Sequence, residues 1–456
     1  MNEKIVAENK MGVMPEGKLL INMSLPMMIS MLVQAMYNIV DSLFVAHFHE
    51  DALTATSLAF PMQTIMIAIG AGTGVGVNAL ISRALGQKNQ KRVNEVAMNG
   101  IFIFLLSYVV VALIGIFGSA PFYNFCTKPG QEQISDFGVQ YLTIVMAGSF
   151  GAFMQFVFER ILQSTGRTFL TMISQSTGAI TNIILDPILI FGYFGMPRLG
   201  VAGAALATII GQLFAAILAV IFNLIYNQDV QLSFKHFKPN FRIIGEIYVI
   251  GIPSIAMQSI GSVMVTGMNK ILNGFSGGDV AVSVFGIYFK MQSFFFMPVF
   301  GLNNGLIPIV SYNYGAGNKK RMINTLKYGY VIAFGFMLLG FVAFMAIPDK
   351  LLLAFNAKEQ MLSIGVPALR IISVHFLVAW YCIVTGSVFQ ALGKAVYSLY
   401  VSLARQLVVL LPAAYVLAKI GGLSMVWWSF PIAEIMSMVM STICLKSVYE
   451  KVIKKI

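Results

Sequence analysis

Gln34-Ala35-Met36-Tyr37-Asn38-Ile39-Val40-Asp41 is a polar stretch inside a long apolar run from Leu19 to His47, in which Asp41 is the only charged residue. On a helix the other polar residues precede Asp41 by seven, four and three positions, so all four share one stripe. They are Gln34, Tyr37 and Asn38. A carboxyl group inside hydrocarbon indicates a site for a proton, a cation or a polar substrate. The alternative is an Asp that is neutralised by a helix neighbour and serves packing alone.

The composition around this stretch is that of an integral membrane protein. Of the 456 residues 58% are hydrophobic and 11% are charged, whereas soluble domains carry about 25% charged residues. The net charge is +12, yet the basic residues form short clusters between apolar runs. That pattern is typical of membrane orientation, so we expect no nucleic-acid partner.

Neither the cysteines nor the amino terminus changes this assignment. Cys126, Cys382 and Cys444 are far apart and require neither an oxidising compartment nor bound zinc. Residues 1–18 are mixed and polar, and the apolar run that follows is long enough to span. We therefore expect a retained first span and no cleaved signal.

Runs of about 20 apolar residues are the mark of membrane-spanning helices, since open sheet edges do not occur in lipid. The predicted spans are 19–47, 52–81, 96–120, 137–158, 168–193, 199–226, 243–273, 280–312, 325–347, 362–389, 395–418 and 422–445. The fold class is therefore all-α, with twelve transmembrane helices. The termini and the even-numbered connections with their edges hold 21 of the 30 basic residues, which predicts that both termini are cytoplasmic.

The two halves of the chain repeat each other. Residues 81–89 after the second span align with 310–318 after the eighth at an offset of 229, and 163–167 align with 390–394 at an offset of 227. Pro26 pairs with Pro253, and Pro187 with Pro412. The polar, basic connection 227–242 separates the halves, so we expect an N-lobe of residues 1–234 and a C-lobe of residues 235–456. Repeats of the same orientation are an arrangement of transporters.

Asp186 adds a second polar stripe. Asn182 lies one turn before it, and Pro187 has no amide hydrogen to give to the Ile183 carbonyl. A free carbonyl beside a carboxyl group suits a hydronium ion, a water molecule or Na⁺. The alternative is a kinked packing helix whose Asp is satisfied locally, because membrane helices tolerate such kinks.

The repeat assigns this acidic pair to one lobe. Asp41 aligns with Met268 or Asn269, and Asp186 aligns with Leu411. We therefore expect ion coupling in the N-lobe and a moving wall in the C-lobe. If the two carboxyl groups share a low-dielectric cavity, their mutual repulsion makes them able to load and release protons.

The other intramembrane charges remain open. Glu434 has no acidic partner on its helix, so pairing with a basic residue such as Lys290 or Arg405 and a function of its own are equally open. For Lys290 and Arg405, structural pairing and a gate or cavity charge are equally open. The glycines of residues 70–76 are not followed by the Lys of a phosphate loop and favour close helix packing instead. Neither a nucleophile arrangement nor a metal cluster is present in the sequence, so we expect no enzyme, no catalytic residue and no cofactor.

Together, several stretches resemble the multidrug and toxic compound extrusion (MATE) family over essentially the whole chain. They are Ser24-Leu25-Pro26, Tyr37-Asn38 with Asp41, Arg83-Ala84-Leu85-Gly86, Gln163-Ser164-Thr165-Gly166-Arg167, Asn182-Ile183-Ile184-Leu185-Asp186-Pro187 and Gly203-Ala204-Ala205-Leu206-Ala207-Thr208. The resemblance implies a V of two six-helix lobes that exports organic cations in exchange for H⁺ or Na⁺.

The resemblance also implies where the cation site lies. It would consist of Asp41, Asn182, Asp186 and Thr208, with Gln34, Tyr37, Asn38 and Lys290 as neighbours or cavity residues; Na⁺ is the one metal expected there. Some members use acidic residues in the seventh and tenth helices. Here those spans offer Lys270, Arg370 and His375, with Glu246 near an end, so the chain looks closer to the DinF-like or MepA-like branches.

The first hypothesis is therefore a monomeric multidrug antiporter of a bacterial cytoplasmic membrane, with small organic cations and membrane lipid as its partners. The coupling ion is H⁺ and/or Na⁺. The alternative is a flippase for lipid-linked precursors, which needs basic cavity residues to hold a diphosphate; the chain offers mainly Lys290, Arg370 and Arg405. An intramembrane protease with Asp41 and Asp186 as its dyad is a third interpretation, against which the lack of a catalytic motif speaks.

Overall fold

The computed structural model describes residues 8–456 except residues 128–129, 234, 236 and 356. Every regular element among these residues is a helix, because only helices and closed barrels satisfy their backbone groups in lipid. The predicted all-α class is confirmed.

The helices and their bounds are α1 (Lys10–Val13), α2 (Glu16–Phe48), α3 (Glu50–Gly86), α4 (Gln90–Cys126), α5 (Glu132–Ala147), α6 (Phe150–Ser164), α7 (Thr168–Phe191), η1 (Tyr193–Gly195), α8 (Val201–Tyr226), α9 (Phe241–Leu272), α10 (Gly278–Gly315), α11 (Lys319–Ala346), α12 (Pro348–Leu353), α13 (Glu359–Ser373), α14 (Phe376–Ala391), α15 (Ala395–Leu403), η2 (Ala404–Leu410), α16 (Leu411–Val426), α17 (Ser429–Lys451) and η3 (Ile453–Lys455).

These helices occupy the predicted spans. Within the described residues, nine stretches are long and apolar enough to cross a membrane, and the pairs α5–α6 and α13–α14 each form one more bent span. The remaining predicted span is α7, where Asn182 and Asp186 lower the hydropathy of the helix. The eleventh span is longer than expected, because α16 continues to Val426 across a kink at Gly421 and Gly422.

Two spans are broken at equivalent positions of the repeat. The axis turns by 43° between α5 and α6 and by 49° between α13 and α14. Gly148 lies in the first break and His375 in the second, 227 residues later. The apolar runs alone predict continuous helices here, because hydropathy does not report a local break.

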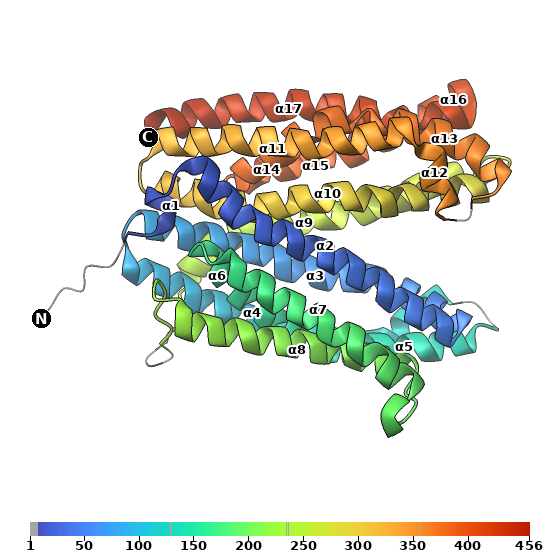
Figure 1. Cartoon of the computed structure of the whole chain (residues 1–456), viewed down its shortest axis with the longest axis horizontal. Coiled ribbons are helices and arrows are strands. Elements are labelled where there is room, and N and C mark those ends of the chain that lie inside the picture. Colours follow the sequence, from blue (N-terminus) through green and yellow to red (C-terminus); the bar gives the residue numbers. More distant parts are fainter. Residues whose placement is uncertain (1–7, 128–129, 234, 236, 356) are drawn as a thin grey trace, which may run out of the picture.

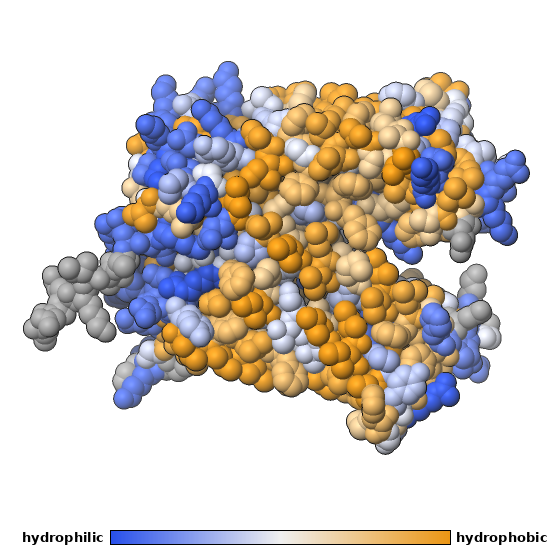
Figure 2. All heavy atoms as spheres, viewed as in Figure 1, coloured by the Kyte–Doolittle hydropathy of each residue, from blue (hydrophilic) through white to orange (hydrophobic). Residues whose placement is uncertain are grey.

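The helices gather in two groups (Figure 1), α3–α8 in the lower part of the view and α9–α17 in the upper part, with both termini at the same end. Each group has its own buried core. In Figure 2 a broad apolar band separates hydrophilic ends, and the surface is hollowed between the groups at the end opposite the termini. The expected boundary at residues 234 and 235 falls where residue 234 lies outside the described residues.

Reciprocal contacts show how the repeats meet. A Cβ atom on Gly86 would collide with the Tyr312 carbonyl, and a Cβ atom on Gly315 would collide with the Arg83 carbonyl. With the repeat offset of 229, Gly86 corresponds to Gly315 and Arg83 corresponds to Tyr312. Each contact is therefore the repeat equivalent of the other, as expected of two equivalent units around a two-fold axis. Two equivalent hydroxyl groups also donate at the same distance, Ser82 to the Ser164 carbonyl and Ser311 to the Ala391 carbonyl, both at 2.9 Å.

Helix α2 connects the two groups. Its first half packs on α10, where a Cβ atom on Gly301 would lie 2.6 Å from the backbone of Met28. The Ser24 hydroxyl donates to the Leu302 carbonyl at 3.2 Å. Its second half packs on α7. The Gln34–Asp41 stretch therefore lies on a helix that is anchored in both halves of the molecule.

Candidate functional site

Close packing of α7 on α8 positions the amide and hydroxyl groups of the predicted site. A Cβ atom on Gly211 would lie only 2.6 Å from the Gly178 carbonyl oxygen, so small residues allow the two backbones to touch. One turn beyond Gly178, the Asn182 Nδ2 donates to the Thr208 Oγ1 at 3.2 Å. The Thr208 hydroxyl in turn donates to the Ala204 carbonyl at 3.1 Å.

Helix α2 brings Asp41 to this α7–α8 surface, where its carboxyl group lies close enough to that of Asp186 for the two to influence each other electrostatically. Asp186 is fully buried, whereas Asp41 is half-buried. Three of the four carboxyl oxygens are buried without a hydrogen-bond partner among the described residues, and so is the Asn182 Oδ1. These four acceptors from α2 and α7 form a place where a proton, a cation or a water molecule can bind.

The carboxyl and amide oxygens of this cluster suit both coupling ions that the sequence suggests. Ionised carboxylates only accept hydrogen bonds, so Asp41 and Asp186 can bond to each other only if one of them carries a proton. Carboxylate and amide oxygens are also ligands of hard cations, and transporters hold Na⁺ with such oxygens beside irregular backbone. Asp41, Asn182 and Asp186 would hold the ion, with the Thr208 oxygen beside them.

Two tyrosines form the wall of this site. The Tyr37 phenol is within hydrogen-bond reach of the Thr208 hydroxyl. Tyr141, on α5, is buried and interacts with Asp41 and Tyr37. Gln63 orients it by donating to its hydroxyl at 3.1 Å. The sequence does not single out Tyr141, because one Tyr in an apolar run carries no motif.

The remaining residues of the polar stripe face another way. Gln34 and Asn38 are exposed on α2, as are the nearby Met36 and Ile39. The predicted stripe is therefore divided, with Tyr37 and Asp41 turned to the buried site. Gln34 and Asn38 remain candidates for contact with substrate only.

Two charged residues inside the spans of the C-lobe, Arg405 and Glu434, form an ion pair. Arg405 Nη1 and Glu434 Oε2 lie 3.0 Å apart, which decides the open choice between Arg405 and Lys290. Arg405 is on the π-helical turn η2, a type of turn that is frequent at functional sites. Lys290 is exposed on α10, and no acidic group in the described part of the chain lies within 4 Å of its amine. The structure therefore does not join Lys290 to the Asp41 site.

The acidic and histidine side chains of the seventh and tenth spans are also engaged. Glu246 forms an ion pair with Arg92 of α4. His375 is buried and its Nδ1 donates to the Ile372 carbonyl at 2.8 Å, as expected of a packing residue. The described residues contain no group of three metal-binding side chains.

A buried carboxyl group that the sequence analysis missed lies on α6. Glu159 is 2% exposed and accepts hydrogen bonds from Gln155, Ser174 and Gln175. It follows the predicted span 137–158 directly and precedes Arg160, so it resembles part of a solvated charge pair. Its neighbours Ser174 and Gln175 are polar residues of α7 that could have indicated a buried partner.

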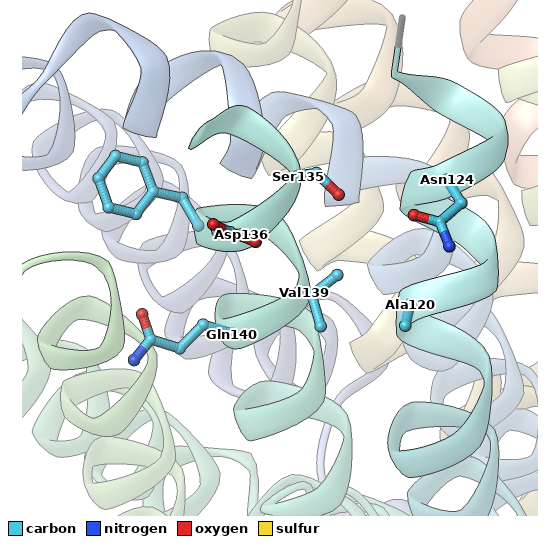
Figure 3. Close-up of a pocket in the computed structure, with 7 residues that line it drawn as sticks. Ala120, Asn124, Ser135, Asp136, Val139 and Gln140 are labelled. Carbon is cyan, nitrogen blue, oxygen red and sulfur yellow. The ribbon is translucent and has the colours of Figure 1, made fainter. Parts of the chain in front are cut away.

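The hollow in Figure 3 lies between α4 and α5, apart from these polar groups. Asn124 and Asp136 border it and both are exposed. An open surface of this kind offers no buried, convergent polar groups, which are the mark of a specific site. The Asp41–Asp186 cluster is therefore the better candidate.

Comparison with known proteins identifies the family of the chain. The model of the MatE family matches residues 26–188 and 245–416. The multidrug export protein MepA of Staphylococcus haemolyticus is 29% identical over 419 residues, which cover 91% of this chain and 90% of that protein. MepA of Staphylococcus aureus (strain MRSA252) is 28% identical over 425 residues, which cover 92% and 91%.

Solved structures match over nearly the whole chain. An outward-facing multidrug resistance MATE family transporter of the MOP superfamily aligns with a TM-score of 0.91 at 24% identity, covering 100% of both chains. A MOP superfamily transporter from Pyrococcus furiosus aligns with a TM-score of 0.89 at 24% identity, covering 98% of this chain and 100% of that one. At this identity the likeness establishes the fold.

Proposed function

The chain belongs to the MatE family, and we propose on that premise that it is a multidrug exporter that expels organic cations in exchange for H⁺ or Na⁺. It is a membrane transporter and not an enzyme, and it lies in the MepA-like branch. Its relatives bear the name multidrug export protein. Its location would be the bacterial cytoplasmic membrane, with both termini in the cytoplasm.

One observation carries this proposal. The carboxyl groups of Asp41 and Asp186 come from different helices and influence each other electrostatically. Three of their buried oxygens have no hydrogen-bond partner among the described residues. An uncompensated buried charge strongly destabilises a protein. Binding of a proton or a cation relieves this repulsion, so occupancy of the pair changes the energy of holding α2 against α7.

Helix α2 can transmit this change, because it contacts both halves of the molecule. A cation at Asp41 would draw the second half of α2 towards α7, and release of the cation would let it move away. The hollow between the helix groups opens at the end opposite the termini, which is the outer side if both termini are cytoplasmic. Rocking of the lobes around residues 227–242 would then give alternating access.

The free energy of the ion sets the power of the pump. One proton that moves inward across about 100 mV gains about 2.3 kcal/mol, and one pH unit adds about 1.4 kcal/mol. For a neutral cargo, both the membrane potential and the pH difference contribute to the driving force. Exchange of one proton for one monovalent cation moves no net charge, so only the pH difference drives it, at about tenfold per pH unit.

Efflux of a fluorescent organic cation from energised cells tests the proposal. We expect Asp41→Asn and Asp186→Asn each to reduce efflux to the level of cells without the protein, at equal expression. Asp136→Asn is the matched control, because Asp136 is an exposed carboxyl group on α5. Full efflux by both site variants would contradict the proposal.

The flippase alternative has weaker support. A diphosphate headgroup needs free basic groups, and the Arg405 guanidinium is paired with Glu434 at 3.0 Å. Binding of a lipid diphosphate compared with binding of an organic cation to the purified protein separates the two. Preferential binding of the diphosphate would favour the flippase.

A further inference from the structure

Glu159 is the centre of a buried hydrogen-bond network that reaches α2 and α7, the two helices that carry the carboxyl groups of the proposed cation site. Its Oε1 accepts from the Gln155 Nε2 at 3.0 Å and from the Ser174 hydroxyl at 2.9 Å. Its Oε2 accepts from the Gln175 Nε2 at 2.7 Å. All three donors are neutral, so the carboxyl group is held by hydrogen bonds alone.

The network continues to α2. The Ser30 hydroxyl, which is 1% exposed, donates to the Oε1 of Gln175. Gln175 therefore links Glu159 of α6 to the same helix that carries Asp41. Ser30 precedes Asp41 by eleven residues, which is about 16 Å along a helix. The Gln175 side chain thus connects Glu159 to the middle of α2, between the half of α2 that packs on α10 and the half that packs on α7.

Arg160 is the charged group nearest to Glu159, but its guanidinium points elsewhere. The Arg160 Nη1 donates to the Gln163 Oε1 at 2.9 Å and to the Asn304 Oδ1 at 3.0 Å. Among the described residues Glu159 forms no ion pair. Burial without a counter-ion favours a neutral carboxyl group, whereas three donors favour a carboxylate. Because these influences oppose each other, Glu159 can exist in both forms.

A proton on Glu159 would reverse the direction of the network. A protonated Oε2 that points its O–H at Gln175 cannot pair with the Nε2 of that amide, which is also a donor. The Gln175 amide must turn so that its oxygen accepts from Glu159, and its nitrogen then donates to Ser30. The Ser30 hydroxyl is thereby free to donate to the carbonyl four residues earlier in α2, a bond that bends helices.

We propose that Glu159 is a third proton-carrying group of the transporter, and that it sets the position of the Asp41 half of α2 through Gln175 and Ser30. The proposal rests on the function proposed above. Glu159 is a positioning residue here, since it acts on the cation site through α2. It gives the protein a proton response that is separate from the carboxyl pair.

Two serines provide a matched test. Ser30 and Ser174 are both buried and each donates one hydrogen bond to this network, but only Ser30 belongs to α2. Spin labels at exposed Leu43 of α2 and Phe214 of α8, in a cysteine-free background, report the position of α2 by pulsed electron paramagnetic resonance. At a pH where Glu159 is ionised, we expect Ser30→Ala to change the ratio of α2 positions about fivefold, as for one lost hydrogen bond. Ser174→Ala, which changes only how tightly Glu159 holds its proton, should leave that ratio unchanged at the same pH.

The pH response separates this proposal from the proposed function. In the Asp41→Asn/Asp186→Asn background we expect the α2 distance still to change between pH 6 and pH 8, roughly the range in which buried carboxyl groups titrate. Adding Glu159→Gln should abolish that change, and Glu159→Asp should restore it. A change that persists with Glu159→Gln, or equal effects of Ser30→Ala and Ser174→Ala, would overturn the proposal. Failure of the proposed function would instead appear as full efflux by the Asp41 and Asp186 variants.

Discussion

Removal of either partner of the Arg405–Glu434 ion pair should destabilise the protein by different amounts. The Glu434 side chain is 3% exposed and the Arg405 side chain is 32% exposed. Arg405→Met leaves a buried carboxylate without its cation, which costs about 3–5 kcal/mol of unfolding free energy. Glu434→Gln leaves a guanidinium that is partly exposed and an amide oxygen that still accepts its hydrogen bond, so we expect about 1–2 kcal/mol.

The double variant sharpens this prediction. A buried ion pair replaced by apolar groups of similar volume is often neutral in stability. Arg405→Met/Glu434→Leu should therefore recover most of the loss caused by Arg405→Met. Lys290→Met is the control, because Lys290 is an exposed base on α10.

Reversible unfolding in mixed micelles with a denaturing detergent measures these free energies. The expected order of destabilisation is Arg405→Met first, then Glu434→Gln, with Lys290→Met close to the parent protein. Equal losses in the two single variants, or a double variant no more stable than Arg405→Met, would refute the reasoning from burial.

Three further perturbations test the packing and the cytoplasmic end. Gly211→Ala would place a methyl group 2.6 Å from an α7 carbonyl and should lower stability by about 1–3 kcal/mol, whereas Gly245→Ala, with no neighbouring atom within 4 Å, should be neutral or stabilising. Burial is the main cause that lowers the pKa of Lys10 below its ordinary 10.5, and the charge of Arg167 lowers it further. The unfolded chain thus binds this proton more tightly, so stability rises with pH between the lowered pKa and 10.5; Lys10→Met should remove that rise from a stability–pH curve. Arg321 donates to two carbonyl groups of the amino-terminal segment, and Arg321→Ala should speed hydrogen exchange of residues 10–14, measured by mass spectrometry.

The membrane spans could be predicted because a run of about 20 apolar residues is itself the requirement for crossing the hydrocarbon core. Asp41 and Asp186 could be chosen as candidates for a cation site for a related reason, since a carboxyl group is costly in hydrocarbon and polar neighbours recur at helical spacing. Their direct approach to each other depends on α2 packing against α7. No pattern within either helix contains that information.

Other features depend on three-dimensional placement. The breaks at Gly148 and His375 leave the apolar runs intact, so only the repeat offset connects them. Glu159 precedes a basic residue at the end of a predicted span, where a charge is ordinary. The partner of Glu434 could not be chosen by sequence, because Lys290 and Arg405 are both basic residues inside spans and only tertiary packing brings Arg405 to it.

The central claim is that a cation at the Asp41–Asp186 pair drives export. Transport of an organic cation in proteoliposomes, with pH and Na⁺ gradients imposed separately, tests it most directly and identifies the ion. We predict that one of these gradients drives transport by the parent protein and that neither gradient drives it in Asp41→Asn or Asp186→Asn vesicles. Gradient-driven transport at the parent rate in both variants would contradict the claim.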